Sequence, residues 1–250
     1  MEDTLLITSK KMNKYPELIN LLTKKPLNFN NNIISIDEIA NNYKLIEQEI
    51  NYHFDKIIKP IQNHTDNICI ITSDNINSTF ENVDGLITNL KGVALAISLA
   101  DCQGILLYDP IKKVIGNIHS GWKGTFNKII VKAINIMIDI YGSNPKDIIV
   151  YITPSIGKCC FEVDEELKNK FMINYHDIDN LISLGEIKDG KQKYYIDLLE
   201  INIKNLIDLG ISRENIDVAD ICTKCNSNKF HSYRAEKEKS GRNISIICMK

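Results

Sequence analysis

The stretch LADCQGILLYDPIKKVIGNIHSGWKGT, residues 99–125, decides the fold, because it places a cysteine and a histidine among three apolar runs. Its runs GILLYD and VIGNIH are rich in Ile, Val and Leu and end at turn-forming residues, which is typical of strands. Cys102 precedes the first of these strands, and His119 ends the second. Since strands that follow each other in sequence are usually neighbours, both side chains can lie at one edge of a sheet.

The same pattern extends upstream of this stretch. Short apolar or alternating runs recur from residue 68 to residue 119, separated by Asp, Asn, Gly and Pro. We predict that these runs are strands of one sheet. They are ICIIT, DGLIT, VALAISLA, GILLYD and VIGNIH.

Helices are expected on both sides of the predicted strands. Ser35 and Glu38 have the spacing of a capping box and predict a helix at about residues 36–54. A second helix is expected at 129–141, where apolar residues recur at helical intervals before Gly142. The other expected elements are a strand TLLITS followed by an irregular stretch, a strand DIIVYIT, a helix capped by Asp164 and running to about residue 173, a helix LLEINIKNLIDLG, and a final strand NISIICM.

Length and composition limit the class of protein. The chain has 250 residues with no linker or internal repeat, which predicts a single mixed α/β (α+β) domain over residues 1–250. Lys and Arg number 30 against 32 Asp and Glu, so no strong field favours nucleic acid or a membrane surface. Acidic Glu2 and Asp3 follow Met1, and no apolar run approaches the roughly 18 residues of a membrane span. We therefore expect a cytoplasmic protein, as a monomer or homodimer.

Cys102 and His119, with His64 as a third candidate, carry the strongest chemical signal. Two histidines and one thiolate make three zinc ligands with an open fourth position, which is the arrangement of a catalytic metal site. The same atoms also fit a cysteine nucleophile with His119 as its base, with Asp101 orienting the base. The plainer interpretation, a buried thiol and a hydrogen-bonded histidine, stays open as well.

Basic residues near these strands suggest an anion site. In GWKGT, Lys123 and backbone N–H groups could face a ligand, with Thr125 capping the helix that follows. The order Lys-Gly-Thr does not match the Walker pattern, so a nucleoside triphosphatase is not expected. Arg234 and Arg242 in the C-terminal region could hold phosphate, or belong to a solvated charged surface.

The segment CTKC, with Cys222 and Cys225, has the spacing of a metal knuckle. Two thiols are too few for a closed metal site, and no second CxxC or HxxxH pair follows. We therefore expect no metal there, unless folding brings Cys159 and Cys160 to the same place. The odd number of seven cysteines does not suggest a disulfide framework.

Taken together, these stretches resemble the laccase-domain or polyphenol oxidase-like family, whose members are now regarded as zinc-dependent purine nucleoside enzymes. The matching pieces, in the order of the family, are QNHT, DGLIT, VALAISLADC, HSGWKGT, PSIGKCCFEV and CTKCNSNKFHSYR followed by GR. The chain departs from the family pattern near its start, where Lys10 stands in place of an expected Arg and the usual pair of glycines is missing. Lys123 likewise replaces a common Arg.

The resemblance implies a function, a cofactor and a fold. The metal ligands of the family fall on His64, Cys102 and His119, and the implied reactions are phosphorolysis of adenosine, inosine, guanosine and methylthioadenosine, with adenosine deamination as a further activity. The implied partners are a nucleoside and phosphate, and the implied fold resembles that of cysteine-hydrolase toxins. Asp101 is a candidate for proton transfer in this reaction, and the alternative that its carboxylate caps a turn or orients a zinc ligand stays open.

Three alternatives are considered for the same residues, and one is not an enzyme: a zinc-stabilised interaction module, which is expected to close the fourth zinc position with another Cys or His. The other two are activities. Some relatives are described as peptidoglycan editing factors, which would make the protein an amidase with a Cys102 and His119 dyad. Copper-dependent phenol oxidation is less well supported, because a multicopper centre needs many imidazoles and the chain has only five histidines.

Overall fold

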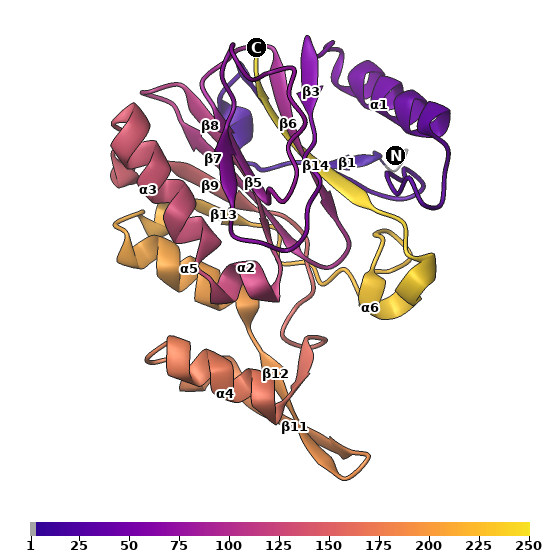
Figure 1. The fold of residues 1–250 in the computed structure, drawn as a ribbon, viewed down its shortest axis with the longest axis vertical. Coiled ribbons are helices and arrows are strands. Elements are labelled where there is room, and N and C mark those ends of the chain that lie inside the picture. Colours follow the sequence, from indigo (N-terminus) through magenta and orange to yellow (C-terminus); the bar gives the residue numbers. More distant parts are fainter. Residues whose placement is uncertain (1–3) are drawn as a thin grey trace.

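Two β-sheets packed face to face form the body of the protein, and helices cover their outer faces (Figure 1). The computed structural model describes residues 4–250; Met1–Asp3, whose acidic pair supports the expectation of a cytoplasmic protein, lie outside the described residues. The arrangement is a mixed α/β fold with several sheets, as predicted.

The first sheet has five strands in the order β1-β2-β14-β6-β3. These strands are β1 (Leu6–Ile7), β2 (Leu18–Thr23), β3 (Lys56–Ile58), β6 (Val93–Leu99) and β14 (Asn243–Met249). The C-terminal strand β14 lies between β2 and β6 and is antiparallel to both. The run that forms β2 falls in the stretch predicted to be irregular, and its pairing with the distant β14 makes it a strand.

The second sheet has six strands in the order β13-β9-β7-β8-β5-β4. These strands are β4 (Ile68–Ile70), β5 (Gly85–Thr88), β7 (Gln103–Asp109), β8 (Val114–Ser120), β9 (Ile149–Ile152) and β13 (Ile216–Val218). Its central strands β7 and β8 are antiparallel neighbours and are buried along their whole length. Burial on both faces explains their nearly continuous apolar sequence.

The prediction that all five runs belong to one sheet is wrong. Strand β6 pairs with β14 and β3 in the first sheet, whereas β4, β5, β7 and β8 belong to the second. Residues 100–102 carry the chain from one sheet to the other, and Asp101 adopts the left-handed conformation there, with φ of 82°. Runs buried on both faces have the same composition in either sheet, so sequence alone does not separate them.

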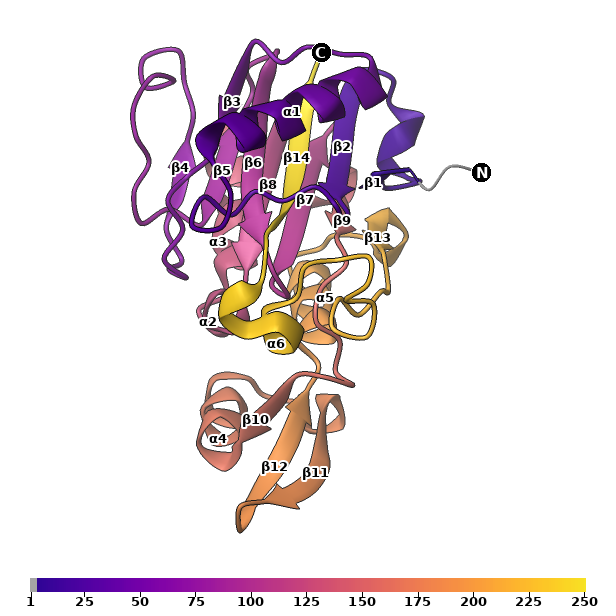
Figure 2. The ribbon, with the colours of Figure 1, turned by 90° about the vertical axis from the view of Figure 1, so that its right-hand side faces the viewer.

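The helices fall into two outer layers. Helix α1 (Ile36–Ile50) packs on the first sheet, and α3 (Ile129–Tyr141) and α5 (Leu198–Asp208) pack on the second (Figure 2). The remaining helices are α2 (Trp122–Phe126), α4 (Glu165–Asn174) and α6 (Tyr233–Glu236), with 3-10 turns at Met12–Lys14, Pro145–Asp147, Asp179–Leu181, Arg213–Asn215 and Lys237–Lys239. The capping box is confirmed at the start of α1, and α3 ends at Gly142 in the left-handed conformation, as expected.

A small lobe projects from one end of the body (Figure 1). It consists of α4, which the sequence analysis predicted, and a three-stranded antiparallel sheet, which it did not predict. The strands of this sheet are β10 (Glu162–Asp164), β11 (Ile182–Lys188) and β12 (Lys191–Ile196). Asp164 is the residue before α4, as predicted, but its side chain makes no capping hydrogen bond and pairs with Lys193 instead. The apolar core of the lobe continues onto α2 and α5, which connects the lobe to the body.

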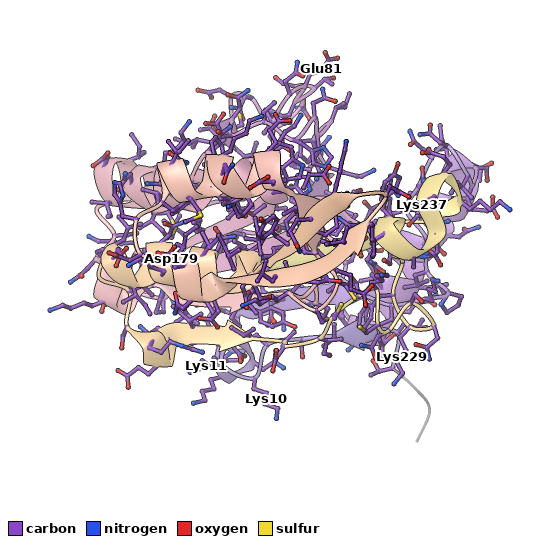
Figure 3. All side chains as sticks on the ribbon, turned by 90° about the horizontal axis from the view of Figure 1, so that it is seen from below. Lys10, Lys11, Glu81, Asp179, Lys229 and Lys237 are labelled. Atoms are coloured by element: carbon purple, nitrogen blue, oxygen red, sulfur yellow. The ribbon has the colours of Figure 1, made fainter. Side chains whose placement is uncertain are left out.

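The outer surface agrees with the near-neutral balance of charge. Lys10 and Lys11 lie at the opposite edge of the molecule from Glu81 (Figure 3). Lys10, which replaces an arginine of the family pattern, is exposed. Over residues 4–250, the helices are all too short or too polar to cross a membrane.

Asn117 of β8 makes a polar connection across the interior between the sheets. Its side-chain nitrogen donates to the carbonyl oxygens of Leu95 on β6 and Ser245 on β14, at 2.9 and 3.0 Å. Its side-chain oxygen accepts a hydrogen bond from the Ser245 hydroxyl at 3.0 Å. Asn117 is fully buried, so these bonds fix the position of one sheet against the other without competition from water.

Replacing Asn117 with alanine should therefore destabilise the protein. The substitution removes three hydrogen bonds and leaves buried acceptors without a donor, which should cost about 2–4 kcal/mol of unfolding free energy. Chemical denaturation would measure this cost, with Asn41→Ala on the exposed face of α1 as the matched control. Equal midpoints for the two variants would show that the connection between the sheets adds no stability.

Candidate metal centre

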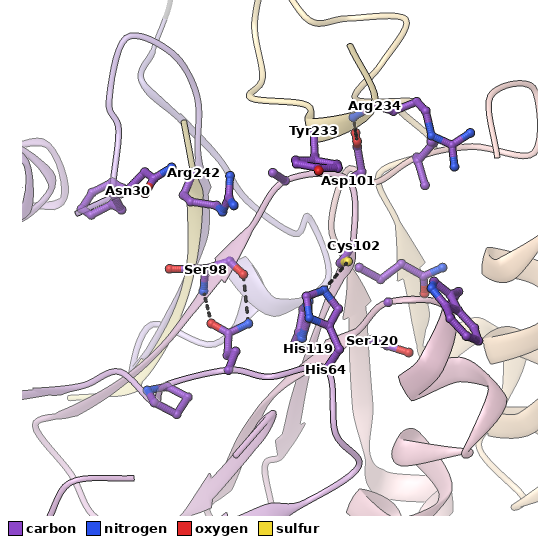
Figure 4. Close-up of a pocket in the computed structure, with 18 of the residues that line it drawn as sticks. Asn30, His64, Ser98, Asp101, Cys102, His119, Ser120, Tyr233, Arg234 and Arg242 are labelled. Carbon is purple, nitrogen blue, oxygen red and sulfur yellow. Dashed lines mark hydrogen bonds between the residues drawn. The ribbon is translucent and has the colours of Figure 1, made fainter. Parts of the chain in front are cut away.

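His64, Cys102 and His119 come together at the end of the two sheets, although they are far apart in sequence (Figure 4). His64 lies in the loop between β3 and β4, Cys102 lies where the chain crosses between the sheets, and His119 is on β8. One ligand atom from each lies within 4.8 Å of the others. The Cys102 Sγ to His64 Nε2 distance is 3.9 Å, so both groups can reach a shared ion.

A buried carboxylate, that of Asp84, holds both histidines in place. Its Oδ1 lies 2.7 Å from His119 Nδ1 and accepts a hydrogen bond from the His64 backbone N–H. Its Oδ2 accepts hydrogen bonds from the backbone N–H and the hydroxyl of Thr65, each at 2.6 Å. Since Nδ1 of His119 is used by Asp84, its Nε2 is left for a ligand, which is the usual arrangement of a metal-binding histidine.

Two further contacts position the loop and the thiol. The side-chain amide of Gln62 pairs with the backbone of Ser98, donating to its carbonyl oxygen and accepting from its N–H, which attaches the His64 loop to β6. At Gly121, an added Cβ would lie 2.8 Å from Cys102 Sγ. Glycine is therefore required there so that the thiol can face the two histidines.

The electrostatics of this cluster favour a thiolate. Burial raises the pKa of Cys102, but His119 and His64 outweigh it and lower the pKa to about 6. Burial lowers the pKa of His119, whereas Cys102 and Asp84 raise it to about 9. For Asp84, burial raises the pKa, but hydrogen bonds from His119 and Thr65 bring it down to about 2. A thiolate is the form of cysteine that binds metals and acts as a nucleophile.

The donor set fits a metal ion with an open coordination position. The three residues line one end of a cavity of about 640 Å³, so a fourth ligand can approach from the cavity. Two imidazoles and a thiolate with such an opening are typical of a catalytic site rather than a closed structural one. The volume lies within the range of pockets for small molecules.

Asp101 lies beside Cys102 in the cavity wall, but it does not orient His119. One carboxylate oxygen accepts a hydrogen bond from the Thr223 hydroxyl, and the other accepts one from the Arg234 backbone N–H, each at 2.6 Å. The alternative in which Asp101 orients the base is wrong, because Asp84 makes that contact. The contacts of Asp101 hold two loops together at the wall of the cavity.

The two predicted arginines line the same cavity but differ in their contacts. Arg234 donates to the carbonyl oxygens of Cys160 and Glu162, at 3.0 and 3.3 Å, and its guanidinium group points away from Cys102 (Figure 4). Arg242 donates to two carbonyl oxygens of its own loop, and its guanidinium group points into the cavity on the side of Ser98. Lys59, which the sequence analysis missed, lines the cavity as well.

The GWKGT segment differs from the expected anion loop. Helix α2 begins after Gly121 and has only five residues, and Thr125 is buried inside it rather than capping α3. The Thr125 hydroxyl is hydrogen-bonded to Ser120 and Asn202 instead. Lys123 is exposed and is not among the lining residues of the cavity, so its role in phosphate binding stays a prediction.

Two polar atoms in the cavity wall have no hydrogen-bond partner within residues 4–250. They are the Ser98 hydroxyl oxygen and the side-chain nitrogen of Gln103, both buried. Buried polar groups are nearly always paired, but both atoms are covered by protein, so a ligand could reach them only after a side-chain rotation. Neither these atoms nor Asp84 could be found by sequence reasoning, although DGLIT shows an acidic residue immediately before a strand.

Comparisons with known proteins place the chain in a family. The family model for the multi-copper polyphenol oxidoreductase laccase matches residues 29–250. The chain belongs to this family. Its members include proteins of known sequence and structure that match over most of this chain.

Two relatives and one solved structure describe the extent of the likeness. "Purine nucleoside phosphorylase YlmD" of Bacillus subtilis is 37% identical over 167 residues, which are 67% of this chain and 59% of YlmD. The "Purine nucleoside phosphorylase" of Borreliella burgdorferi is 36% identical over 223 residues, 87% of each chain. The crystal structure of the hypothetical protein YfiH from Bacillus licheniformis superposes with a TM-score of 0.88 at 27% identity, covering 100% of this chain and 98% of YfiH.

Substituting Asp84 by asparagine should weaken metal binding without removing a ligand. The carboxylate fixes the ring of His119 and increases its basicity, and loss of such a partner typically lowers metal affinity about 10–100-fold. Competition with a chelator of known affinity would measure the change. Asp66→Asn serves as the control, because Asp66 lies in the same loop and pairs with Lys132 at the surface. Equal affinities in the two variants would exclude this role for Asp84.

Proposed function

We propose that this protein is a zinc-dependent purine nucleoside phosphorylase. One observation carries the proposal: the three metal-binding residues form one end of a cavity that also holds cationic, aromatic and unpaired polar side chains. Both relatives described above are named purine nucleoside phosphorylases, which supports the same activity.

Phosphorolysis needs phosphate beside the ribose. A phosphate oxygen forms a bond to the anomeric carbon while the bond from that carbon to the purine nitrogen breaks, and the departing purine takes up a proton. Arg242 and Lys59 both line the cavity, and burial first, then the charge of Arg242, lower the pKa of Lys59. Two neighbouring cations that repel each other are stabilised by an anion between them, so this pair is the proposed phosphate site.

The rest of the cavity suits a nucleoside. Phe29, Trp122 and Tyr233 line it and offer ring faces to a purine. Rotation of the Ser98 or Gln103 side chain would bring a buried, unpaired polar atom towards the ribose hydroxyls or the base. Adenosine, inosine, guanosine and methylthioadenosine are the proposed substrates, with adenosine deamination as a further proposed activity.

Zinc is the proposed metal, and it would be held by His64, Cys102 and His119. When bound, zinc supplies Lewis-acid chemistry at that end of the cavity. The family description names copper, and two histidines with one cysteine also occur in blue-copper sites; zinc is proposed because the same three residues leave a fourth position open towards the cavity, as in catalytic zinc sites. Within residues 4–250, none of the other histidines joins a group of potential metal ligands, which argues against a multicopper cluster.

Asp101 has a positioning role in this proposal. Both of its carboxylate oxygens are engaged by Thr223 and Arg234, so it holds the wall of the cavity. Proton transfer by Asp101 stays a prediction. The thiolate of Cys102 acts as a metal ligand.

One observation favours a second candidate, an amidase. Cys102, His119 and Asp84 form a line in which the carboxylate holds the imidazole and the imidazole faces the thiol, as in cysteine hydrolases. This arrangement, together with the proposed resemblance to the cysteine-hydrolase toxin fold, would fit hydrolysis of amide bonds in peptidoglycan precursors. His64 on the other side of the thiol favours the metal site, because a catalytic dyad does not require it.

The proposal also covers the domain organisation, location, oligomeric state and partners of the protein. We infer that residues 1–250 act as a single domain in the cytoplasm, as a monomer or homodimer, with a nucleoside and phosphate as small-molecule partners and no nucleic acid or membrane partner. The near-neutral charge balance supports this inference.

A product assay tests the proposed activity directly. Zinc-loaded protein should convert inosine to hypoxanthine and ribose 1-phosphate only when phosphate is present, and a chelator should abolish the reaction. Mass spectrometry of the products would identify the sugar phosphate. Cleavage that continues in chelator, or hydrolysis of peptidoglycan peptides by metal-free protein, would favour the amidase.

The phosphate site makes a separate prediction. Arg242→Ala should lower phosphate-dependent cleavage of inosine about 10–100-fold, since a charge-assisted hydrogen bond contributes roughly 1.5–3 kcal/mol. Deamination of adenosine uses water, so its rate should fall much less. Arg213→Ala, a substitution away from the cavity, is the control. Equal losses of both activities in Arg242→Ala would mean that Arg242 holds the nucleoside or the fold instead.

A further inference from the structure

Four cysteines form a second cluster that the proposed function does not use. Cys159 and Cys160 lie in the loop between β9 and β10, and Cys222 and Cys225 lie in the loop that follows β13. Their sulfur atoms all lie within 4.8 Å of one another. The sequence analysis expects no metal at CTKC unless folding brings Cys159 and Cys160 to the same place, and the structure meets this condition.

The spacing of the sulfurs matches a tetrahedral metal site. Cys225 Sγ lies 3.8 Å from Cys159 Sγ and 3.5 Å from Cys160 Sγ. With zinc–sulfur bonds of about 2.3 Å, the sulfurs of a tetrahedral site are about 3.8 Å apart. Small side-chain movements would therefore place all four thiolates around one ion.

The local structure of CTKC resembles a metal knuckle. The backbone N–H and side-chain amide of Asn226 both donate to the Cys222 carbonyl oxygen, which closes the turn between Cys222 and Cys225. The backbone N–H groups of Cys225 and Gly157 donate hydrogen bonds to the Cys222 thiol. Backbone N–H groups that stabilise a thiolate are suited to a ligand position.

We propose that Cys159, Cys160, Cys222 and Cys225 bind a second zinc ion in a closed, structural site. Four thiolate ligands select zinc or iron–sulfur centres over harder ions, and four protein ligands leave no position for a substrate. None of the four cysteines is among the lining residues of the cavity, so this site is separate from the centre at Cys102.

The position of the cluster gives this zinc a structural role. The first two cysteines begin the segment that leads into the lobe, and the other two precede α6, which carries Arg234. These loops already meet through the Thr223 N–H, which donates to the Ser155 carbonyl oxygen at 2.9 Å, and through Arg234, which donates to the Cys160 carbonyl oxygen. A shared ion would fasten the lobe to the cavity wall where Asp101 contacts Thr223 and Arg234.

Metal analysis of Cys102→Ala protein tests the proposal, because this variant lacks a ligand of the first site. The variant should retain about one zinc per chain. Adding Cys225→Ser should reduce this to nearly none, whereas adding Cys69→Ser should leave it unchanged, since Cys69 on β4 is outside the cluster. Cobalt-loaded Cys102→Ala protein should show intense thiolate-to-cobalt absorption that Cys225→Ser removes.

A second measurement needs no substitution in the cluster. Cys159 and Cys225 are exposed, so as free thiols they are accessible to iodoacetamide, which is applied at alkaline pH because burial raises the pKa of Cys159 to about 11. In Cys102→Ala protein, bound zinc should block alkylation of both, and a chelator should restore it. Zinc-free protein with freely alkylated thiols, a disulfide within the cluster, or bound iron in place of zinc would each overturn the proposal.

Discussion

The contact between the Asp84 carboxylate and His119 is the interaction on which the rest of the site depends. Asp84 is fully buried and His119 is 4% exposed, so the pair is shielded from water and attracts strongly. A buried charge is costly unless it is paired and hydrogen-bonded, and Asp84 meets this condition through His119 and the backbone of the His64 loop. The same carboxylate thus fixes one ligand directly and a second through its loop.

The crossing of the chain between the two sheets supplies the third ligand. Cys102 lies at the end of the two packed sheets, close to the histidines, because β6 and β7 are consecutive in sequence but belong to different sheets. The cavity opens where this crossing meets the His64 loop, α2 and the C-terminal segment with Arg242. The architecture therefore explains why the candidate metal ligands, aromatic rings and a cation line one cavity. The four-cysteine cluster lies outside this cavity, next to the wall where Thr223 donates to Asp101.

The sequence predicts local features well and long-range features poorly. The capping box at Ser35, the end of α3 at Gly142 and the strands β7 and β8 follow from patterns within a few residues. The division into two sheets depends on β14, which pairs with β2 and β6 from the far end of the chain. Asp84, Lys59 and the meeting of CTKC with Cys159 likewise depend on contacts between distant segments. The convergence of His64, Cys102 and His119 was predicted from the family resemblance, since spacing alone left it open.

Anomalous scattering at the zinc absorption edge, measured on crystals of zinc-loaded protein, tests the central claim most directly. We predict a peak bonded to Cys102 Sγ and to one ring nitrogen of each of His64 and His119, with His119 Nδ1 still in contact with Asp84. A structure with full zinc occupancy elsewhere and no peak at these three residues would contradict the account.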